Sequence, residues 1–440
     1  MISSLLYLLS AFLMIIAIDC LSAPSRVVRG YHIAMVSVGI ALITCLTLNL
    51  KYNAGWILLA LCAGSGSGVL LATKWQLSAL PQIVALLNGI GGLASALIVC
   101  CPFKYHKDNL LESLCVVIGL VAFSGSIVAF AKLHGLLRKN VAWLKWVSLF
   151  LEILLLINIA YFTYFQQGFA GIILLSILIG FCAIMPIGGA DMPVIISLLN
   201  SFSGWAVVTV GLLAGDLLLI ITGTLVGASG TILSYVMCKS MNRSLLKIVW
   251  PETQSIETEH KSTGIVRTGS PEEAAFIMSN SHKVIIVPGF GMAAAQAQIA
   301  LKNMTNILTE KYGVDVRFAI HPVAGRMPGH MNVLLAEAQI PYEKVFAMED
   351  INQDFASADV VYVIGANDVT NPIAKTDVGS PLYGMPVLAV EKAKTIFFVK
   401  RSMASGYSGI ENPLFYAPNT IMLFGDAKKV TENIVKDLEK

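Results

Sequence analysis

The chain has 440 residues, a net charge of +3 and only 13% charged residues, and its mean hydropathy is +0.74. The acidic residues are unevenly placed, because only six of the 27 lie before residue 241. This composition excludes a single water-soluble domain and predicts a membrane half followed by a soluble half. The small net charge and the lack of a basic patch argue against nucleic-acid binding.

The first half consists of apolar runs, each near the roughly 20 residues that cross a bilayer as a helix. The nine expected spans are residues 2–20, 32–50, 54–73, 82–101, 113–132, 143–163, 168–187, 192–213 and 217–238. The connections after the first, third, fifth and ninth spans carry the larger excess of Lys and Arg. By the positive-inside rule these connections are cytoplasmic, so we expect an N-terminus outside and a second half in the cytoplasm.

The second half has the pattern of an α/β domain. Residues 240–264 are polar, contain Pro251 and lack an apolar period, which predicts a linker between a membrane domain (1–239) and a soluble domain (265–440). The expected strands are Val284–Val287, Val316–Ile320, Lys344–Met348, Asp359–Ile364, Val387–Ala389, Thr395–Val399 and Thr420–Phe424. Because helix-like runs separate them, we expect a Rossmann-like, doubly wound parallel sheet beside the membrane helical bundle.

A glycine turn follows the first of these strands. Gly289, Gly291 and Ala294 form a Gly-x-Gly-x-x-Ala pattern between the strand and a helix-favouring run that extends to about Lys302. In such motifs the first glycine turns the chain, the second lets the backbone approach a pyrophosphate, and the small third residue lets the helix pack. The N–H groups at the helix start would face the phosphates. A tight turn that binds nothing remains an alternative.

Two cations and a hydroxyl end a later strand. Lys400, Arg401 and Ser402 follow Thr395–Val399, and doubly wound sheets bind ligands at the carboxyl ends of their strands. These side chains suit a phosphate monoester. An NAD site usually has a carboxylate after its second strand, whereas here that strand ends in His321. The pattern therefore favours NADP over NAD.

Three further loops are candidates for the same site. Arg326 lies in a Gly- and Pro-framed loop that suits a phosphate contact, although a plain surface loop is an equal alternative. The stretch 365–368 ends another strand and therefore faces the same edge of the sheet. Tyr407 lies in a small-residue loop that could fold over a ligand.

Polar residues within the apolar spans are costly and usually line a path for ions or protons. Asn88 lies in the fourth span, and Asp191 and Asn200 bracket the start of the eighth, nine residues apart. Asp216 lies in a predicted turn, where a solvated carboxylate is the favoured interpretation, and Glu152 is a weaker candidate within the sixth span. No histidine lies in the interior of a span, so this chain offers no imidazole at the centre of a proton path.

Several long motifs together resemble the β subunit of proton-translocating NAD(P) transhydrogenase. They are the stretches 190–194, 241–244, 288–298, 321–331, 365–368, 400–402 and 425–428. The resemblance covers almost the whole chain. It implies an NADP(H)-binding domain whose nucleotide lies reversed relative to the usual Rossmann orientation. It also implies a partner α subunit, with further membrane helices, that binds NAD(H).

The resemblance assigns roles to individual residues. Gly289 and Gly291 would hold the pyrophosphate with help from Arg326, residues 400–402 would hold the 2′-phosphate, and Tyr407 would belong to a lid. The residues assigned to NADP(H) are Gly289, Phe290, Gly291, Met292, Ala293, Ala324, Gly325, Arg326, Gly365, Ala366, Asn367, Asp368, Lys400, Arg401, Ser402, Gly406, Tyr407, Gly425 and Asp426.

Asp368 is the candidate catalytic residue, since it resembles the family acid that couples nucleotide occupancy to protonation. Asn88, Asp191 and Asn200 are assigned to the proton path. Some members of the family have a histidine where this chain has Asn88, and asparagine does not accept a proton near neutral pH. In chains of this kind the histidine is attributed to the partner's membrane helices. No metal site is expected.

The resemblance therefore implies half of an enzyme in a bacterial inner membrane, active only with its partner and assembled as a dimer of α–β units. One fingerprint cannot bind two nucleotides, and the hydride chemistry belongs to the cofactors. The alternative is a transporter or channel that NADP(H) gates without hydride chemistry. Against it, the spans contain no polar constellation of the size a substrate needs. A single-chain oxidoreductase would need a second pocket that the sequence does not show.

Overall fold

The computed structural model describes most of the chain. It does not describe residues 1, 23–26, 76–78, 102–107, 138–140, 142, 189–190, 242–243, 250–265, 326–328, 378–379, 381 and 404–409. The described chain divides into two compact units. One consists of Met1–Val128, Trp146–Cys182 and Leu199–Thr231, and the other of Ala129–Lys145, Ala183–Leu198 and Ile232–Lys440. The predicted boundaries at residues 239 and 264 stay predictions.

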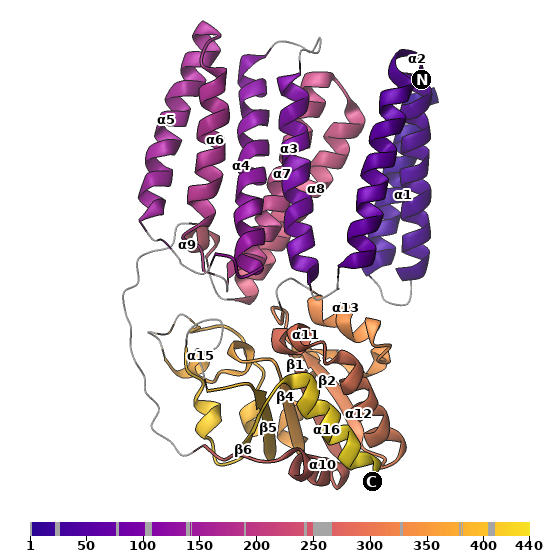
Figure 1. The fold of residues 1–440 in the computed structure, drawn as a ribbon, viewed down its shortest axis with the longest axis vertical. Coiled ribbons are helices and arrows are strands. Elements are labelled where there is room, and N and C mark those ends of the chain that lie inside the picture. Colours follow the sequence, from indigo (N-terminus) through magenta and orange to yellow (C-terminus); the bar gives the residue numbers. More distant parts are fainter. Residues whose placement is uncertain are drawn as a thin grey trace. The chain divides into compact units, whose positions relative to one another are not determined.

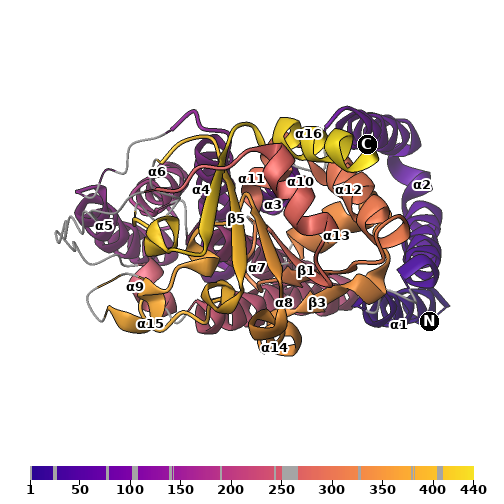
Figure 2. The same cartoon turned by 90° about the horizontal axis from the view of Figure 1, so that it is seen from below.

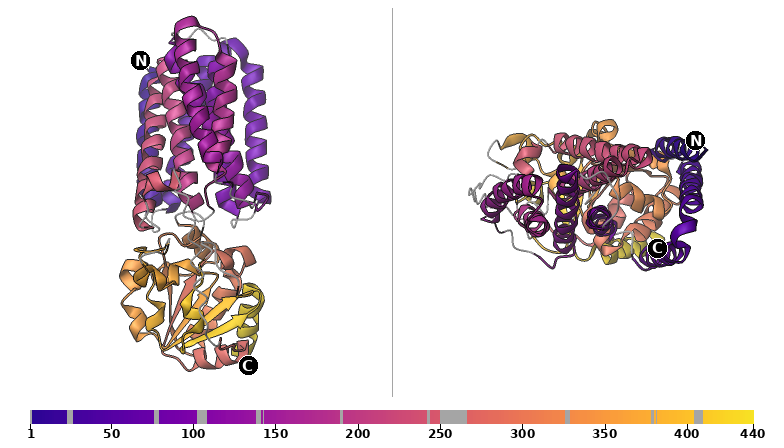
Figure 3. Two further views of the ribbon diagram at one scale, coloured as in Figure 1. Left: turned by 90° about the vertical axis from the view of Figure 1, so that its left-hand side faces the viewer. Right: turned by 90° about the horizontal axis from the view of Figure 1, so that it is seen from above.

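The apolar part of the chain is helical and its helices run side by side (Figures 1 and 3). They are α1 (Ile2–Ser22), α2 (Val27–Lys74), α3 (Leu80–Cys100), α4 (Asn109–Leu133), α5 (Leu144–Phe165), α6 (Phe169–Ile184), α7 (Met192–Ala214) and α8 (Leu217–Ser240). Among the described residues, seven segments are long and apolar enough to cross a membrane, and two shorter apolar helical segments accompany them. The expected count of nine spans therefore stays a prediction. Helical backbone also continues through residues 51–53, where we expected a break.

Glycines let two pairs of these helices approach closely, as small residues do between membrane-type helices. A Cβ on Gly92 of α3 would lie 2.5 Å from the carbonyl oxygen of Gly119 on α4. A Cβ on Gly204 of α7 would lie 2.4 Å from the amide nitrogen of Gly227 on α8. By contrast, no described atom lies within 4 Å of the Cβ position of Gly64, so its glycine-rich face has no such contact.

The carboxyl-terminal half is a six-stranded parallel sheet with the order β3-β2-β1-β4-β5-β6. The strands are β1 (Lys283–Pro288), β2 (Asp315–Ile320), β3 (Val345–Ala347), β4 (Val360–Ile364), β5 (Thr395–Lys400) and β6 (Thr420–Phe424). The helices are α9 (Leu245–Val249), α10 (Pro271–Ser279), α11 (Phe290–Ala295), α12 (Gln298–Glu310), α13 (His330–Glu337), α14 (Met348–Ile351), α15 (Ile373–Thr376) and α16 (Ala427–Glu439). This order is that of a doubly wound sheet, and the parallel strands agree with the expectation from the sequence.

Both faces of the sheet are buried, which explains its uninterrupted apolar strands. Val284 and Ile286 of β1 pack in one core with α10, α12 and α16, whereas Ile285 and Val287 pack in a second core with α14. Figure 2 shows α10, α12 and α16 on one side of the strands and α14 on the other. Successive residues point to opposite faces of a strand, so each strand contributes to both cores.

Two expectations about the domain were wrong. Residues 387–389 form no strand. β4 already pairs with β1 on one side and with β5 on the other, so no further strand can pair between β4 and β5. This segment bonds instead to the loop after β4, through the N–H of Leu388 and the carbonyl of Val369 (3.0 Å). The helix after the glycine turn is not continuous, since Gln296 adopts the left-handed conformation (φ 54°) and separates α11 from α12. The break lets both short helices bury residues against the sheet, and that packing overrides local helix propensity.

Asp359 fastens the amino ends of three strands. One carboxylate oxygen accepts the N–H groups of His282 (2.9 Å) and Lys283 (3.1 Å), and the other contacts the Lys394 ammonium at 2.7 Å. The bond from Lys394, opposed by partial burial and assisted by the two N–H groups, lowers the pKa of Asp359 to about 2.

Asp359→Asn should therefore reduce stability in a pH-dependent way. The folded pKa lies below the ordinary value of 3.8, so the stabilisation is complete above about pH 4 and is lost as the pH falls towards 2. At pH 6 the variant should be less stable by about 1.5–3 kcal/mol, the range for a hydrogen bond to a charged group. Thermal unfolding of the full chain in detergent should show a lower Tm at pH 6 and a smaller difference at pH 3. Glu432→Gln, which breaks an exposed 3.9 Å ion pair, is the control. Equal losses at both pH values would contradict the assignment.

Candidate functional site

The candidate nucleotide residues gather at one edge of the sheet. The strands are parallel and in register, with Pro288 beside Ile364, Ile364 beside Val399, and Lys400 beside Phe424. The loops that follow β1, β4, β5 and β6 are therefore neighbours. The strand order reverses between β1 and β4, and such a switch point is where open α/β sheets bind ligands.

Three glycines interlock at this switch point. The N–H of Gly289 donates to the carbonyl of Ile364 (2.9 Å), and the N–H of Gly291 donates to the carbonyl of Gly365 (2.9 Å). A Cβ on Gly289 would lie 2.3 Å from the Gly365 oxygen, and one on Gly291 would lie 2.6 Å from its Cα. Gly365 itself has φ +71°, and its Cβ would lie 2.1 Å from the nitrogen of Met292. Only glycine fits these three positions.

The backbone donors of the turn are mostly engaged within the protein. Besides the bonds of Gly289 and Gly291, the N–H of Met292 donates to the carbonyl of Gly289 (3.0 Å). The expected row of free N–H groups at the helix start is thus not what the turn presents. The side chains of Met292 and Ala293 are fully buried in the core, and the Phe290 ring lies 6.3 Å from the His330 ring. The first N–H groups of the turn therefore bond to the loop after β4 and within the turn itself.

Lys400, Arg401 and Ser402 lie at the end of β5, next to this turn. Arg401 and Ser402 are exposed, whereas Lys400 is half-buried with its ammonium 4.3 Å from the centre of the Phe415 ring. Burial lowers the pKa of Lys400, and the nearby carboxylates of Asp368 and Glu411 oppose that shift. The site therefore combines two outward-facing polar groups with one partly desolvated cation, which suits an anionic ligand.

A network of asparagines lies beneath the loop after β4. Asn412, fully buried, donates to the backbone and side-chain oxygens of Asn367 (3.3 and 3.2 Å). Asn371, also fully buried, donates to the carbonyl of Glu411 (3.1 Å). These bonds join residues 367–371 to residues 411–414, which the sequence reasoning missed. An Asn-Pro pair at 412–413 predicts a turn, but nothing local shows which loop its side chain contacts.

His321 directly follows β2, and its buried ring has a packing role. It is 1% exposed; its Nδ1 accepts the N–H of Val323 (3.2 Å), so its Nε2–H donates to the carbonyl of Pro386 (2.7 Å). Burial lowers the pKa of His321, against the effects of this bond and of Glu349. The neutral His321 ring therefore holds the start of this loop in place through its hydrogen bond to Pro386. Ala324 in the same loop is buried, and Gly325 has φ +100°.

The other predicted residues of this edge divide into two groups. The N–H of Gly425 donates to the carbonyl of Lys400 (2.9 Å), and Asp426 caps α16 by accepting the N–H groups of its first turn at 3.1 and 3.4 Å. The carboxylate of Asp426 therefore has a structural role. Arg326, Gly406 and Tyr407 lie outside the described residues, so their assignments stay predictions.

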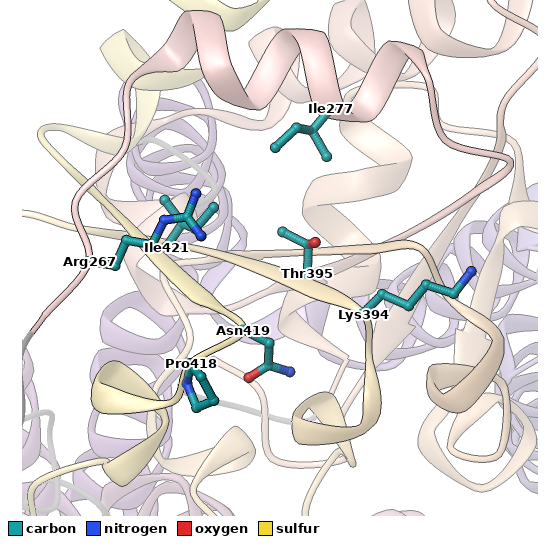
Figure 4. A pocket seen from close by; sticks show the side chains of 7 residues that line it. All are labelled: Arg267, Ile277, Lys394, Thr395, Pro418, Asn419 and Ile421. Atoms are coloured by element: carbon teal, nitrogen blue, oxygen red, sulfur yellow. The ribbon is translucent and has the colours of Figure 1, made fainter.

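A cavity of about 350 Å³ lies at the opposite, amino-terminal edge of the sheet (Figure 4). It is lined by Arg267, Ile277, Lys394, Thr395, Pro418, Asn419 and Ile421. Its two cations are already paired, Arg267 with Glu273 at 3.0 Å and Lys394 with Asp359 at 2.7 Å. Its position and pairing distinguish it from the predicted nucleotide site.

Two of the three candidate proton-path residues lie on helices that contact each other. Asn88 is buried in α3, and Asn200 lies in α7. The Cβ position of Gly91 lies 3.8 Å from Ser203, so each asparagine is one helical turn from the same contact between α3 and α7. Asp191 lies directly before α7 and within electrostatic range of the Cys238 thiol in α8.

One cation in the apolar part of the chain escaped the sequence reasoning. The Lys132 ammonium, at the end of α4, donates to the carbonyls of Met185 (2.5 Å) and Ile187 (2.7 Å), which follow α6. Carbonyls at a helix end lack partners within the helix, and a cation there satisfies them. No signal in the sequence links Lys132 to a segment 53 residues away.

Comparison with known proteins identifies the family. The model of the NAD(P) transhydrogenase beta subunit family matches residues 3–437. Two curated relatives from Rhodospirillum rubrum are both called NAD(P) transhydrogenase subunit beta. Each is 48% identical to this chain over an alignment of 453 residues, which covers 98% of this chain and 97% of the relative. The chain belongs to the NAD(P) transhydrogenase beta subunit family.

Membership in this family agrees with the apolar helices and with the parallel sheet, and it implies nicotinamide nucleotide binding. The glycine approach and the neighbouring cations of residues 400–401 supply features that such a nucleotide needs. Among the described residues, no group of His, Cys, Asp or Glu could hold a metal ion.

Gly365→Ala should show how strictly the switch point depends on its close backbone approach. The matched control is Gly313→Ala, because Gly313 has a similar φ of +68° but no atom within 4 Å of its Cβ position. The control should cost about 1–2 kcal/mol, the conformational penalty alone. Gly365→Ala should cost at least about 2 kcal/mol more, because the two loops must separate. Thermal unfolding of both variants measures the difference, and equal losses would show that the loops yield without strain.

Proposed function

We propose that this chain is the NADP(H)-binding, proton-translocating subunit of an NAD(P) transhydrogenase. The observation that carries the proposal is the position of Lys400, Arg401 and Ser402 beside the interlocked glycines of a topological switch point. A dinucleotide needs a close backbone surface for its pyrophosphate. NADP(H) in addition needs charge-assisted bonds to its 2′-phosphate.

The nucleotide would lie across the carboxyl ends of β1, β4 and β5. Gly289 and Gly291 let the pyrophosphate approach the backbone, while Arg401 and Ser402 face the 2′-phosphate from the solvent side. Lys400 adds a charge whose partly buried ammonium becomes more easily protonated once the phosphate arrives. Asp368 lies in the loop after β4 and has Lys400 within electrostatic range, which suits a residue that couples nucleotide occupancy to protonation.

The reaction proposed is hydride transfer between NADH on a partner alpha subunit and NADP⁺ on this chain, with the stereochemistry of the Si-specific/Re-specific class. NADP(H), when bound, supplies the hydride chemistry, and the chain's residues bind it, orient it and exclude water. The printed name of the relatives, subunit beta, supports a partner. This chain alone would be inactive, and the working assembly would be a dimer of α–β units in the lipid bilayer.

The membrane helices would carry protons. Asn88 and Asn200 each lie one turn from the contact between α3 and α7, and Asp191 lies at the start of α7. Polar atoms at such positions are costly unless they line a hydrated path. The Lys and Arg residues of the connections support an inner-membrane topology with the N-terminus outside and the sheet domain in the cytoplasm.

The alternative function uses the same site. An NADP(H)-gated transporter or channel would use the identical nucleotide site but transfer no hydride. The family and the lack of any substrate-sized polar group in the spans favour the transhydrogenase. Transhydrogenation by the chain with its partner separates the two, since only the enzyme transfers hydride.

Arg401→Ala tests the assignment of the 2′-phosphate. Hydrogen bonds to charged groups contribute about 1.5–3 kcal/mol, so the variant should bind NADPH at least tenfold more weakly while its weak NADH binding stays nearly unchanged. Equilibrium titration of the full-length chain with each nucleotide gives both affinities. Lys394→Ala, at the opposite edge of the sheet, is the matched control and should change neither. Equal losses of NADPH and NADH affinity in Arg401→Ala would refute the assignment.

A further inference from the structure

A chain of side-chain amides leads from a backbone N–H to the Asp368 carboxylate. The N–H of Leu414 donates to Asn412 Oδ1 (3.1 Å). Asn412 Nδ2 donates to Asn367 Oδ1 (3.2 Å), and Asn367 Nδ2 donates to Asp368 Oδ1 (3.3 Å). These bonds connect the segment after β5 with the loop after β4.

The direction of this chain is fixed by its first donor. A backbone N–H can only donate, so the atom of Asn412 that meets Leu414 must be its oxygen. The other side of Asn412 is then its amino group, which must meet the oxygen of Asn367. The amino group of Asn367 is thereby left facing Asp368. The hydrogen-bond partners therefore determine which side-chain atom of each asparagine is the amide nitrogen and which is the oxygen.

Neighbouring contacts hold both asparagines in place. Asn412 is fully buried and also donates to the Asn367 carbonyl (3.3 Å) and to Thr370 Oγ1 (3.4 Å). The Thr370 hydroxyl donates to the same Asn367 carbonyl at 2.8 Å. Asn371 ties the two segments together a second time through the carbonyl of Glu411 (3.1 Å). Rotation of the Asn367 amide would therefore break a buried network, and such networks are strongly directional.

We propose that Asn412 is a positioning residue that acts through Asn367, holding an N–H donor on the Asp368 carboxylate and so favouring its ionised form. A donor that bonds to the charged form of a carboxyl group stabilises that form. Asn412 thus sets the pH at which Asp368 gains a proton, from outside the nucleotide site. The idea goes beyond NADP(H) binding, and its link to affinity rests on the function proposed above.

Other ionisable groups lie near Asp368. Lys400, from β5, is within electrostatic range of both Asp368 and Glu411, and the Tyr416 hydroxyl donates to the Glu411 carboxylate. That hydrogen bond raises the pKa of Tyr416. Lys400 also favours ionised Asp368, so Asn412 is not its sole determinant.

Asn412→Asp reverses the amide chain with a minimal change in shape. One oxygen of the new side chain still accepts the N–H of Leu414, but the other now faces the two oxygens of Asn367. The amide of Asn367 relieves this repulsion by turning its amino group towards position 412. Its oxygen then faces Asp368, an arrangement that favours the protonated carboxyl group. The midpoint of Asp368 titration should rise by about one pH unit, a tenfold change in proton affinity.

Infrared titration of the full-length chain in detergent measures this midpoint directly. The carbonyl band of a protonated carboxyl group that Asp368→Asn removes identifies Asp368. We expect the band to appear at higher pH in Asn412→Asp than in the parent chain. Asn412→Ala, which adds no charge, also frees the Asn367 amide and should raise the midpoint by a smaller amount, so the test survives if the charged variant fails to fold.

Asn419→Asp is the matched control. Asn419 Nδ2 donates to the backbone carbonyls of Ala393 (2.8 Å) and Glu391 (3.4 Å) at the opposite edge of the sheet. Its substitution should lower Tm without moving the Asp368 midpoint. An unchanged midpoint in folded Asn412 variants, an equal shift in the control, or a parent chain without a titrating Asp368 band would each overturn the proposal.

Titration of NADPH affinity against pH in the complex with the partner provides the second readout. Its pH dependence should move with the infrared midpoint in Asn412→Asp and disappear in Asp368→Asn. Asn412→Asp in the Asp368→Asn background should add no pH dependence of its own. An infrared shift in a chain that binds no NADPH would sustain the role of Asn412 and refute the proposed nucleotide site. Uniform loss of affinity at every pH, with an unmoved midpoint, would show that Asn412 only holds the loop.

Discussion

The loops after β1 and β4 pass each other so closely at the switch point that neither can carry a side chain where they meet. The N–H of Gly291 donates to the carbonyl of Gly365 at 2.9 Å, and a Cβ on either residue would lie 2.6 Å or less from the other loop. The sheet order makes these loops neighbours, and the lack of side chains lets their backbones touch. The cations at the end of β5 lie at the same edge of the sheet, where we propose that a dinucleotide binds.

The loops at the carboxyl edge of the sheet contribute different charged and hydrogen-bonding groups. The end of β5 provides exposed polar groups and one half-buried ammonium, while the loop after β4 provides Asp368. Buried asparagines tie the Asp368 loop to residues 411–414, which follow the cationic end of β5 in the chain. A ligand that alters the charge around Lys400 therefore acts on a loop that is already connected to Asp368. This arrangement suits an enzyme in which nucleotide binding and protonation affect each other.

Much of the fold could be predicted because its signals are local. The apolar lengths predict helices, the uninterrupted apolar strands predict a sheet buried on both faces, and Gly289 and Gly291 mark the turn. What failed depends on distant contacts. Residues 387–389 resemble a strand, yet β4 and β5 already pair with each other.

The site was predicted less completely than the fold for the same physical reason. His321 ends a strand as expected but serves as a buried brace through Pro386, 65 residues away. Asn412 and Lys132 gain their importance from partners 45 and 53 residues away in the chain. Neither composition nor spacing encodes which buried polar group will meet which partner. The roles of Arg326 and Tyr407 remain predictions from the resemblance.

The proposed role of this chain is to hold NADP(H) for hydride exchange with a nucleotide on another subunit. Its most direct test is a transhydrogenation assay of the purified chain, alone and reconstituted with its alpha subunit in sealed vesicles that report internal pH. We predict no hydride transfer by the chain alone, and transfer coupled to proton movement once the partner is present. A reconstituted complex that binds NADPH and conducts protons or a solute, but transfers no hydride between NADH and NADP⁺, would contradict the account.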